Sequence, residues 1–134
     1  MRIAIITAMA EETLPILEKT GGVVAEDSVS GVAIKQIETG KHTIYLATTG
    51  IGEIRAATAV QMLVDLFDVE AVLNFGFVGS LNRSIPVGEL VLVERAVHYQ
   101  FGISAVDGLP AGCYDGKKEP YFYLDKTLLG KVQA

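Results

Sequence analysis

Residues 3–12 read IAIITAMAEE, and this stretch decides the fold class. Residues 3–7 are a short run of apolar, β-prone side chains without polar alternation, which predicts a strand buried on both faces at the centre of a sheet. Residues 8–19 follow directly with leucines at helical spacing, and Glu11 and Glu12 lie in the first turn, where acids complement the helix dipole. The chain therefore opens with a strand that leads into a helix.

The next segments continue this pattern of strands, turns and helices. Residues 32–37 and 43–48 are two β-rich segments joined by a glycine-containing turn, which is typical of a hairpin. The sequence GIG at residues 50–52 follows the second strand and opens a helix over residues 53–67. We expect its inner stripe to consist of Ile54, Ala57, Val60, Leu63, Val64 and Phe67.

Two more strands are predicted further along the chain. Residues 71–75 end in a second glycine turn, and residues 89–99 form a long β-branched run; both read as inner strands. Together these elements predict an α/β fold with a mixed, mostly parallel central sheet. Residues 100–120 read as a long loop, and Asp125 as the N-cap of a last helix that carries Leu128, Leu129 and Val132.

The composition narrows the class of protein. The 134 residues correspond to one domain, yet 50% of them are apolar and the mean hydropathy is +0.39. A domain of this size buries only about two-thirds of the surface that its unfolded chain exposes, so this apolar fraction predicts a partner or further chain. The net charge of -5, without a cluster of lysines and arginines, argues against nucleic-acid or membrane partners.

Other compositional features concern the compartment. No apolar run approaches the about 20 residues that a membrane span needs, and the N-terminus does not resemble a signal peptide. Cys113 is the single cysteine, which excludes an internal disulfide. We therefore expect a cytoplasmic protein.

Three of the predicted strands are followed by turns that lead to one edge of the predicted sheet, and helix N-termini lie at this edge. In open α/β folds this carboxyl edge binds the ligand. The turn at residues 50–52 resembles the start of a dinucleotide fingerprint, but Arg55 occupies the third glycine position, which argues against a Rossmann cofactor site. Taken singly, each glycine is better explained as part of a tight turn.

The residues alone leave the chemistry of this edge open. A carboxylate at Glu11 or Glu12 can act as a general base toward water, or it can only cap the helix. The two histidines, His42 and His98, are too few to build a metal site, and no Gly-x-Ser-x-Gly elbow is present. We therefore expect neither a metal nor a serine nucleophile.

Four segments carry a resemblance to a known family. They are IAIITAMAEE at residues 3–12, TGIG at 49–52, NFGFVG at 74–79 and VGELVLV at 87–93. Their order, spacing and placement on strand ends resemble the nucleoside phosphorylase and nucleosidase superfamily, and within it most closely the 5′-methylthioadenosine/S-adenosylhomocysteine nucleosidases. The similarity runs from the N-terminus to the loop near Gly112.

The resemblance implies both a fold and a reaction. It implies a three-layer α/β domain of which residues 1–134 are the N-terminal portion. Such a domain hydrolyses the N-glycosidic bond of an adenine nucleoside with a 5′-thio substituent through an oxocarbenium-like transition state, without a cofactor. Glu12 matches the water-activating glutamate of this family.

The resemblance also implies a substrate pocket. Ala8, Met9 and Ile51 match positions that line the ribose and 5′ pocket, and Gly79 matches the glycine of the central glycine turn. Phe77 stands in this pocket where the family has a small hydroxyl residue that helps to hold the water.

A homodimer is implied as well. Ile103 and Val106 match residues that the family lends to the pocket of a neighbouring subunit. The stretch YQFG at residues 99–102 departs from the family pattern before this loop, so the details of the dimer contact are expected to differ.

The nucleophile can be argued physically. A phosphate nucleophile needs cationic partners, and the phosphorylases of the superfamily place arginines on the first loop and before the central glycine turn. This chain has Ala10, followed by two glutamates, and Asn74 at those places, so we expect water to attack. The leaving-group acid is expected in a second half outside residues 1–134. Alternatives are a phosphorylase or other N-ribosyl hydrolase, and a non-catalytic nucleoside-binding or dimerising protein.

Overall fold

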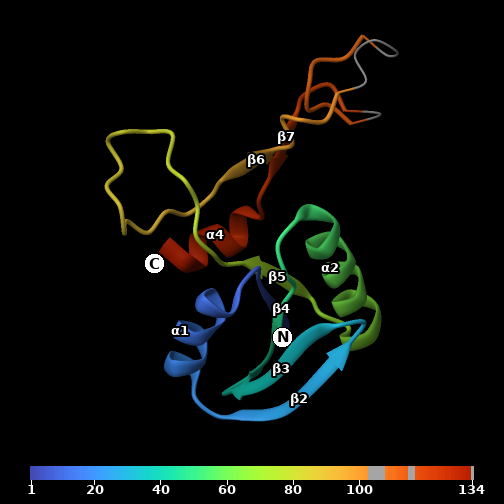
Figure 1. Ribbon diagram of the computed structural model, residues 1–134, viewed down its shortest axis with the longest axis vertical. Helices are drawn as coiled ribbons and strands as arrows, with labels where there is room; N and C mark the ends of the chain where they lie inside the picture. Colours follow the sequence, from blue (N-terminus) through green and yellow to red (C-terminus); the bar gives the residue numbers. More distant parts are fainter. Residues whose placement is uncertain (103–107, 115–116, 134) are drawn as a thin grey trace. The chain divides into compact units, whose positions relative to one another are not determined.

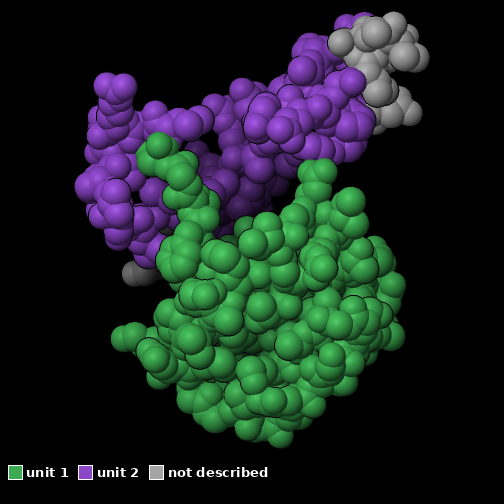
Figure 2. All heavy atoms as spheres, in the orientation of Figure 1, with its two compact units in different colours: residues 1–80 green, residues 81–134 purple. Residues whose placement is uncertain are grey.

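The computed structural model describes residues 1–102, 108–114 and 117–133 (Figure 1). The chain divides into two compact units, Met1–Ser80 and Leu81–Ala134, which Figure 2 colours separately. The expectation that residues 1–134 are the N-terminal portion of a single domain stays a prediction.

The first unit is built on a five-stranded mixed sheet. Its strands are β1 (Arg2–Thr7), β2 (Val23–Val29), β3 (Val32–Thr39), β4 (His42–Thr48) and β5 (Ala71–Asn74), in the order β2-β3-β4-β1-β5. The first strand lies between β4 and β5 and pairs with both in parallel, which confirms it as a central strand. The strands β2, β3 and β4 form an antiparallel meander. The pairing of β3 with β4 confirms the hairpin predicted for residues 32–37 and 43–48.

Two helices cover this sheet, α1 (Ala10–Thr20) and α2 (Glu53–Phe67). The first begins two residues later than predicted, because Ala8 and Met9 form the turn after β1, and it includes Pro15. Gly21 ends it with a φ of 79°, a conformation that glycine adopts without strain. The second helix has the predicted bounds.

The pleat of the sheet assigns each helix to its own face. Side chains alternate along a strand, so Ala4 and Ile6 point to one face and Thr7 to the other. The first face packs on α2 through Ala59 and Leu63, which are both fully buried. Thr7 instead contacts α1, and Figure 1 shows α1 and α2 on opposite sides of the sheet.

The predicted inner stripe of α2 is partly wrong. Leu63 is buried and Val60 and Phe67 are half-buried, but Ile54, Ala57 and Val64 are exposed. The buried stripe instead includes Ala59, because the helix is rotated so that this small side chain meets the sheet. The small side chain of Ala59 permits the close approach of α2 to the sheet. Because apolar residues occur on several sides of this helix, the sequence pattern alone did not determine which side faces the sheet.

The second unit contains a two-stranded antiparallel ribbon, β6 (Arg95–Val97) and β7 (Tyr121–Tyr123), and the helix α4 (Lys126–Gln133). Asp125 accepts hydrogen bonds from the N–H groups of Thr127 and Leu128 at 2.8 and 2.9 Å, which confirms it as the N-cap. The described residues between the two strands form no helix or strand, as expected for the long loop.

The prediction of a long inner strand over residues 89–99 is wrong for this structure. Only Arg95–Val97 pair with another strand, and Leu90 is 86% exposed. A β-branched run forms a strand only where a neighbour accepts and donates its ladder hydrogen bonds, and no described residue does so for residues 89–93. No helix among the described residues is long and apolar enough to cross a membrane.

Candidate functional site

Glu12 lies in the first turn of α1, directly after the carboxyl end of the central strand. The chain leaves β1 at Thr7, turns through Ala8 and Met9, and enters the helix at Ala10. A side chain at the third helical position points back toward the N-cap, so the carboxylate of Glu12 returns to the turn that precedes it. Glu12 is only 3% exposed.

Three backbone N–H groups hold this carboxylate. Oε2 accepts hydrogen bonds from the N–H groups of Ala8 at 2.7 Å and Met9 at 3.1 Å. Oε1 accepts one from the N–H of Phe77 at 2.9 Å, which comes from the loop after β5, 65 positions along the chain. The carboxylate therefore joins the ends of two parallel neighbouring strands.

These contacts determine the charge of the site. Burial raises the pKa of the Glu12 carboxyl, but the N–H groups of Phe77, Ala8 and Met9 lower it by more, so that this pKa lies below its ordinary value. Glu12 is therefore ionised at neutral pH. A buried anion stabilised by backbone dipoles is the main electrostatic feature of the first unit.

Gly76 permits the approach of Glu12 to the second loop. A Cβ atom at this position would lie 2.6 Å from Oε1 and 2.9 Å from Cδ of Glu12, closer than real Cβ contacts. Any other residue at position 76 thus displaces the carboxylate or the loop. The sequence showed a glycine turn here but not its partner, because Glu12 is distant along the chain.

One acceptor position of the carboxylate stays open. An ionised carboxylate has about four lone-pair sites, two on each oxygen. Within the described residues, Oε2 accepts two N–H groups and Oε1 accepts one. By this count, Oε1 retains one acceptor site for a further donor.

The structure brings together some of the residues predicted for the site. Ala8, Met9 and Phe77 surround Glu12 through their backbone N–H groups. The side chain of Phe77 is not part of this contact, and the residue is 71% exposed. The backbone at position 77 thus serves Glu12 whatever side chain stands there.

The other predicted site residues either do not contact Glu12 through a hydrogen bond or lie outside the described residues. Ile51 is 75% exposed on the turn after β4. Gly79 has open space around it, since a Cβ there would meet nothing within 4 Å. Ile103 and Val106 lie outside the described residues. The hydrogen bonds of Glu12 do not involve Ile51 or Gly79.

The geometry also bears on two alternatives, helix capping by Glu12 and a metal site. Glu12 does bond the N–H of the N-cap residue Met9, so helix capping is one part of its role, but its bond to Phe77 reaches beyond the helix. His98 Nδ1 lies 2.6 Å from the hydroxyl of Tyr114. Among the described residues, no group of three His, Cys, Asp or Glu side chains could hold a metal.

Sequence reasoning missed the hydroxyl groups behind this site. The side chains of Thr7, Thr13 and Thr48 come from β1, α1 and β4, and the hydroxyl of Thr13 lies within hydrogen-bond distance of the other two. Threonine is common in strands, so only the return of α1 over the sheet makes them neighbours.

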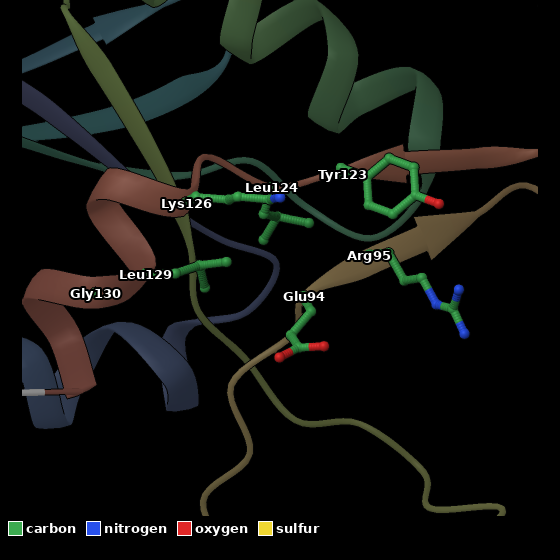
Figure 3. A pocket seen from close by; sticks show the side chains of 7 residues that line it. All are labelled: Glu94, Arg95, Tyr123, Leu124, Lys126, Leu129 and Gly130. Carbon is green, nitrogen blue, oxygen red and sulfur yellow. The ribbon is translucent and has the colours of Figure 1, made fainter.

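A separate pocket of about 430 Å³ lies in the second unit (Figure 3). Residues at the ends of β6 and β7 and on α4 line it, among them Glu94, Arg95 and Lys126. Its lining mixes both signs of charge and includes none of the residues predicted for the site. The pocket does not include Glu12, the residue at which the sequence predicts the chemistry.

The comparison with known proteins identifies the family. The model of the Phosphorylase superfamily matches residues 2–134, and the chain belongs to this superfamily. The family expected from the four sequence segments is thereby confirmed.

Particular relatives narrow the similarity. A 5′-methylthioadenosine/S-adenosylhomocysteine nucleosidase of Bacillus thuringiensis (strain Al Hakam) is 30% identical over 119 residues, which cover 84% of this chain and 51% of that protein. A nucleosidase of the same name from Bacillus anthracis matches with the same identity and coverage. The chain thus spans about half the length of these relatives.

Solved structures agree with the observed fold. The S-adenosylhomocysteine nucleosidase of Streptococcus pyogenes, in complex with 5-methylthiotubericidin, superposes with a TM-score of 0.90 at 27% identity over 99% of this chain and 55% of that one. The Streptococcus pneumoniae nucleosidase with the transition-state inhibitor MT-ImmA gives 0.89 at 29% identity, over 99% and 56%. The expected α/β fold with a mixed sheet is confirmed, and the chain contains only part of the fold that these proteins have.

Proposed function

We propose that the intact protein hydrolyses the N-glycosidic bond of an adenine nucleoside with a 5′-thio substituent, such as methylthioadenosine or S-adenosylhomocysteine, and releases adenine. The observation that carries this proposal is the ionised, buried carboxylate of Glu12 at the carboxyl edge of the central strands. The names of the nucleosidase relatives support the choice of substrate.

Glu12 acts on water in this proposal. A water molecule donates a hydrogen bond to the open acceptor position of Oε1 and attacks the anomeric carbon as the bond to adenine breaks. Its proton passes to the carboxylate. The adenine leaving group needs an acid, and none of the described residues is assigned to that step.

The remaining predicted residues complete the proposed pocket. Ala8, Met9 and Ile51 line the ribose and the 5′ substituent, together with Phe77 and Gly79. In a homodimer, Ile103 and Val106 extend into the pocket of the neighbouring subunit. The proposed reaction uses no cofactor, as the family resemblance implies, and we propose that it takes place in the cytoplasm.

Water is a better nucleophile than phosphate at this edge. The negative charge of Glu12 repels an anion, and the nearby positions Ala10 and Asn74 carry no cationic side chain. We expect adenine release in phosphate-free buffer at a rate that added phosphate does not increase. Cleavage that occurs only with phosphate would assign the protein to the phosphorylases.

The substitution Glu12→Gln tests the role of the carboxylate in the intact protein. It removes the charge and the proton acceptor, so kcat should fall about one hundred- to ten-thousand-fold. The matched control is Glu11→Gln, which removes the same charge from the neighbouring exposed residue and should leave kcat within about twofold. A nearly unchanged rate in Glu12→Gln would falsify the assignment.

This variant also needs a measurement of folding. The side-chain carbonyl oxygen of glutamine still accepts hydrogen bonds but its NH2 nitrogen cannot, so either Phe77 or the pair Ala8 and Met9 faces a donor. A buried donor left unsatisfied costs about 1–3 kcal/mol, so urea unfolding of Glu12→Gln must accompany its kinetics. The rate loss counts only under conditions where the variant is folded.

A second candidate rests on Phe77. Its exposed aromatic ring stands where the related nucleosidases are expected to have a small hydroxyl residue, which favours another N-ribosyl hydrolase of the superfamily with a different substrate. Rates with methylthioadenosine, adenosine and inosine, in the protein and in Phe77→Ser, separate the two. Calorimetry with adenine and methylthioadenosine identifies the non-catalytic alternative, which predicts tight binding without product.

A further inference from the structure

The hydroxyls of two buried threonines, Thr7 and Thr13, and of the half-buried Thr48 form a cluster next to the turn that precedes Glu12. Thr13 Oγ1 lies 2.7 Å from Thr7 Oγ1 and 2.8 Å from Thr48 Oγ1. Thr13 Oγ1 also lies 3.2 Å from the carbonyl oxygen of Met9 and donates to it. Thr7 is fully buried and Thr13 is 5% exposed, so these groups cannot exchange their partners freely with water. We refer to Thr7, Thr13 and Thr48 as the threonine clamp.

One hydrogen-bond arrangement satisfies the whole threonine clamp. If Thr13 donates its proton to Met9, its oxygen can accept the protons of both Thr7 and Thr48. Each hydroxyl then donates once, and Thr13 is saturated. The carbonyl oxygen of Ala47, 3.5 Å from Thr7 Oγ1, is a second and longer acceptor for Thr7. The central position of Thr13 makes it the residue on which the other two depend.

The threonine clamp surrounds the turn that holds Glu12. Thr7 directly precedes Ala8, whose N–H group binds Oε2 together with that of Met9. The hydroxyl of Thr13 donates to the carbonyl of Met9, which also accepts the backbone N–H groups of Glu12 at 3.2 Å and Thr13 at 3.3 Å. Thr48 ties the same cluster to β4, the parallel neighbour of β1. Small rotations of this turn would move both N–H groups away from the carboxylate.

We infer that the threonine clamp positions the catalytic carboxylate, with Thr13 as a positioning residue that acts on Glu12 through the backbone of Ala8 and Met9. This inference rests on the proposed function, because it takes Glu12 as the water-activating group. It differs from a purely structural role in that loss of the hydroxyl changes the proton affinity of Glu12 as well as the stability of the fold.

The test is the titration of Glu12 in the full chain, followed by carbon NMR of labelled glutamate carboxyls and assigned with Glu12→Gln. Burial raises the pKa of this carboxyl, and the N–H groups of Phe77, Ala8 and Met9 lower it. The neighbouring carboxylate on the same helix, Glu11, is exposed. In Thr13→Val, which keeps the shape but lacks the hydroxyl, the midpoint should rise by about one pH unit, tenfold in proton affinity.

Two control variants separate positioning from packing. Thr13→Ser keeps the hydroxyl and should restore the midpoint of Glu12 to within a few tenths of a unit. Thr20→Val removes the same kind of bond from the same helix, because Thr20 Oγ1 donates to the carbonyl of Ile16 at 2.8 Å, but it lies outside the threonine clamp. Thr20→Val should leave the midpoint unchanged.

The outcomes distinguish this inference from the proposed function. An unchanged midpoint and unchanged amide resonances of Ala8 and Met9 in folded Thr13→Val overturn the positioning role, even if the protein is an active nucleosidase. If Thr13→Val does not fold, Thr48→Val takes its place and should shift the midpoint in the same direction by a smaller amount; no shift overturns the inference. A shifted midpoint, together with an intact protein that hydrolyses no nucleoside, supports the threonine clamp and refutes the proposed function.

Discussion

The substitution Gly76→Ala should loosen the site more than its size suggests. The added Cβ would lie 2.6 Å from Oε1 of Glu12, and ordinary contact begins at 3.4 Å, so the carboxylate has to retreat by about 0.8 Å. A shift of this size along the hydrogen bond from the N–H of Phe77 lengthens that bond from 2.9 Å to about 3.7 Å, beyond hydrogen-bonding distance.

The energetic cost follows from this geometry. A hydrogen bond to a charged group contributes about 1.5–3 kcal/mol. Alanine offsets part of the loss, because replacing glycine removes about 0.4–1 kcal/mol of conformational entropy from the unfolded chain. The net destabilisation expected for Gly76→Ala is therefore about 0.5–2.6 kcal/mol. The pKa of Glu12 should also rise, since one of its three N–H donors is lost while its burial remains.

Urea unfolding, followed by circular dichroism, measures the first effect, and carboxyl titration measures the second. Gly79→Ala is the matched control, because it changes a glycine of the same loop where a Cβ meets nothing within 4 Å. This control should be neutral or slightly stabilising. If Gly76→Ala unfolds at the same urea concentration as Gly79→Ala, with Glu12 titrating as in the unchanged protein, the close approach of Glu12 to Gly76 does not hold the site.

Two further predictions concern pH and the second unit. The lowered pKa of Glu12 stabilises the folded state at a pH above the ordinary carboxyl pKa, and this contribution is lost as the pH falls through the lowered folded-state value. The difference in unfolding free energy between the protein and Glu12→Gln should therefore shrink on acidification; a difference that grows contradicts the assignment. Asp125→Ala should destabilise α4 by about 1 kcal/mol through loss of its N-cap bonds, measured by amide hydrogen exchange, whereas Asp125→Asn should retain most of the protection.

The sequence predicted those parts of the fold that depend on local pattern. The strand over residues 3–7, the helix over residues 53–67 and the N-cap at Asp125 all follow from signals within a few neighbouring residues. The strand β2 gave no such signal, because Val24 through Ser28 are exposed and carry no apolar alternation. It forms as an edge strand because the turn at Ser30 and Gly31 folds it back on β3.

At the site, the sequence predicted the contacts within one turn of the chain but not those between distant segments. The role of Glu12 was proposed from a family pattern, and its partners Ala8 and Met9 lie close enough along the chain to be predicted. The amide of Phe77 and the space at Gly76 depend on the pairing of β1 with β5, which sequence spacing does not reveal. The sequence shows the aromatic side chain at position 77, but not that the backbone N–H of this residue reaches Glu12.

The lowered pKa of Glu12 bears on how this carboxylate can serve the proposed hydrolysis. A general base is most effective when its pKa lies near the working pH, so a carboxylate held by three N–H groups is a weak base toward free water. In an oxocarbenium-like transition state, however, the attacking water becomes strongly acidic as it bonds to the cationic carbon, and a weak base then suffices to take its proton. A charge that stays fixed and ionised also stabilises the developing positive charge of the sugar without reorganisation. The backbone donors that lower the basicity of Glu12 thus maintain the negative charge that this reaction needs.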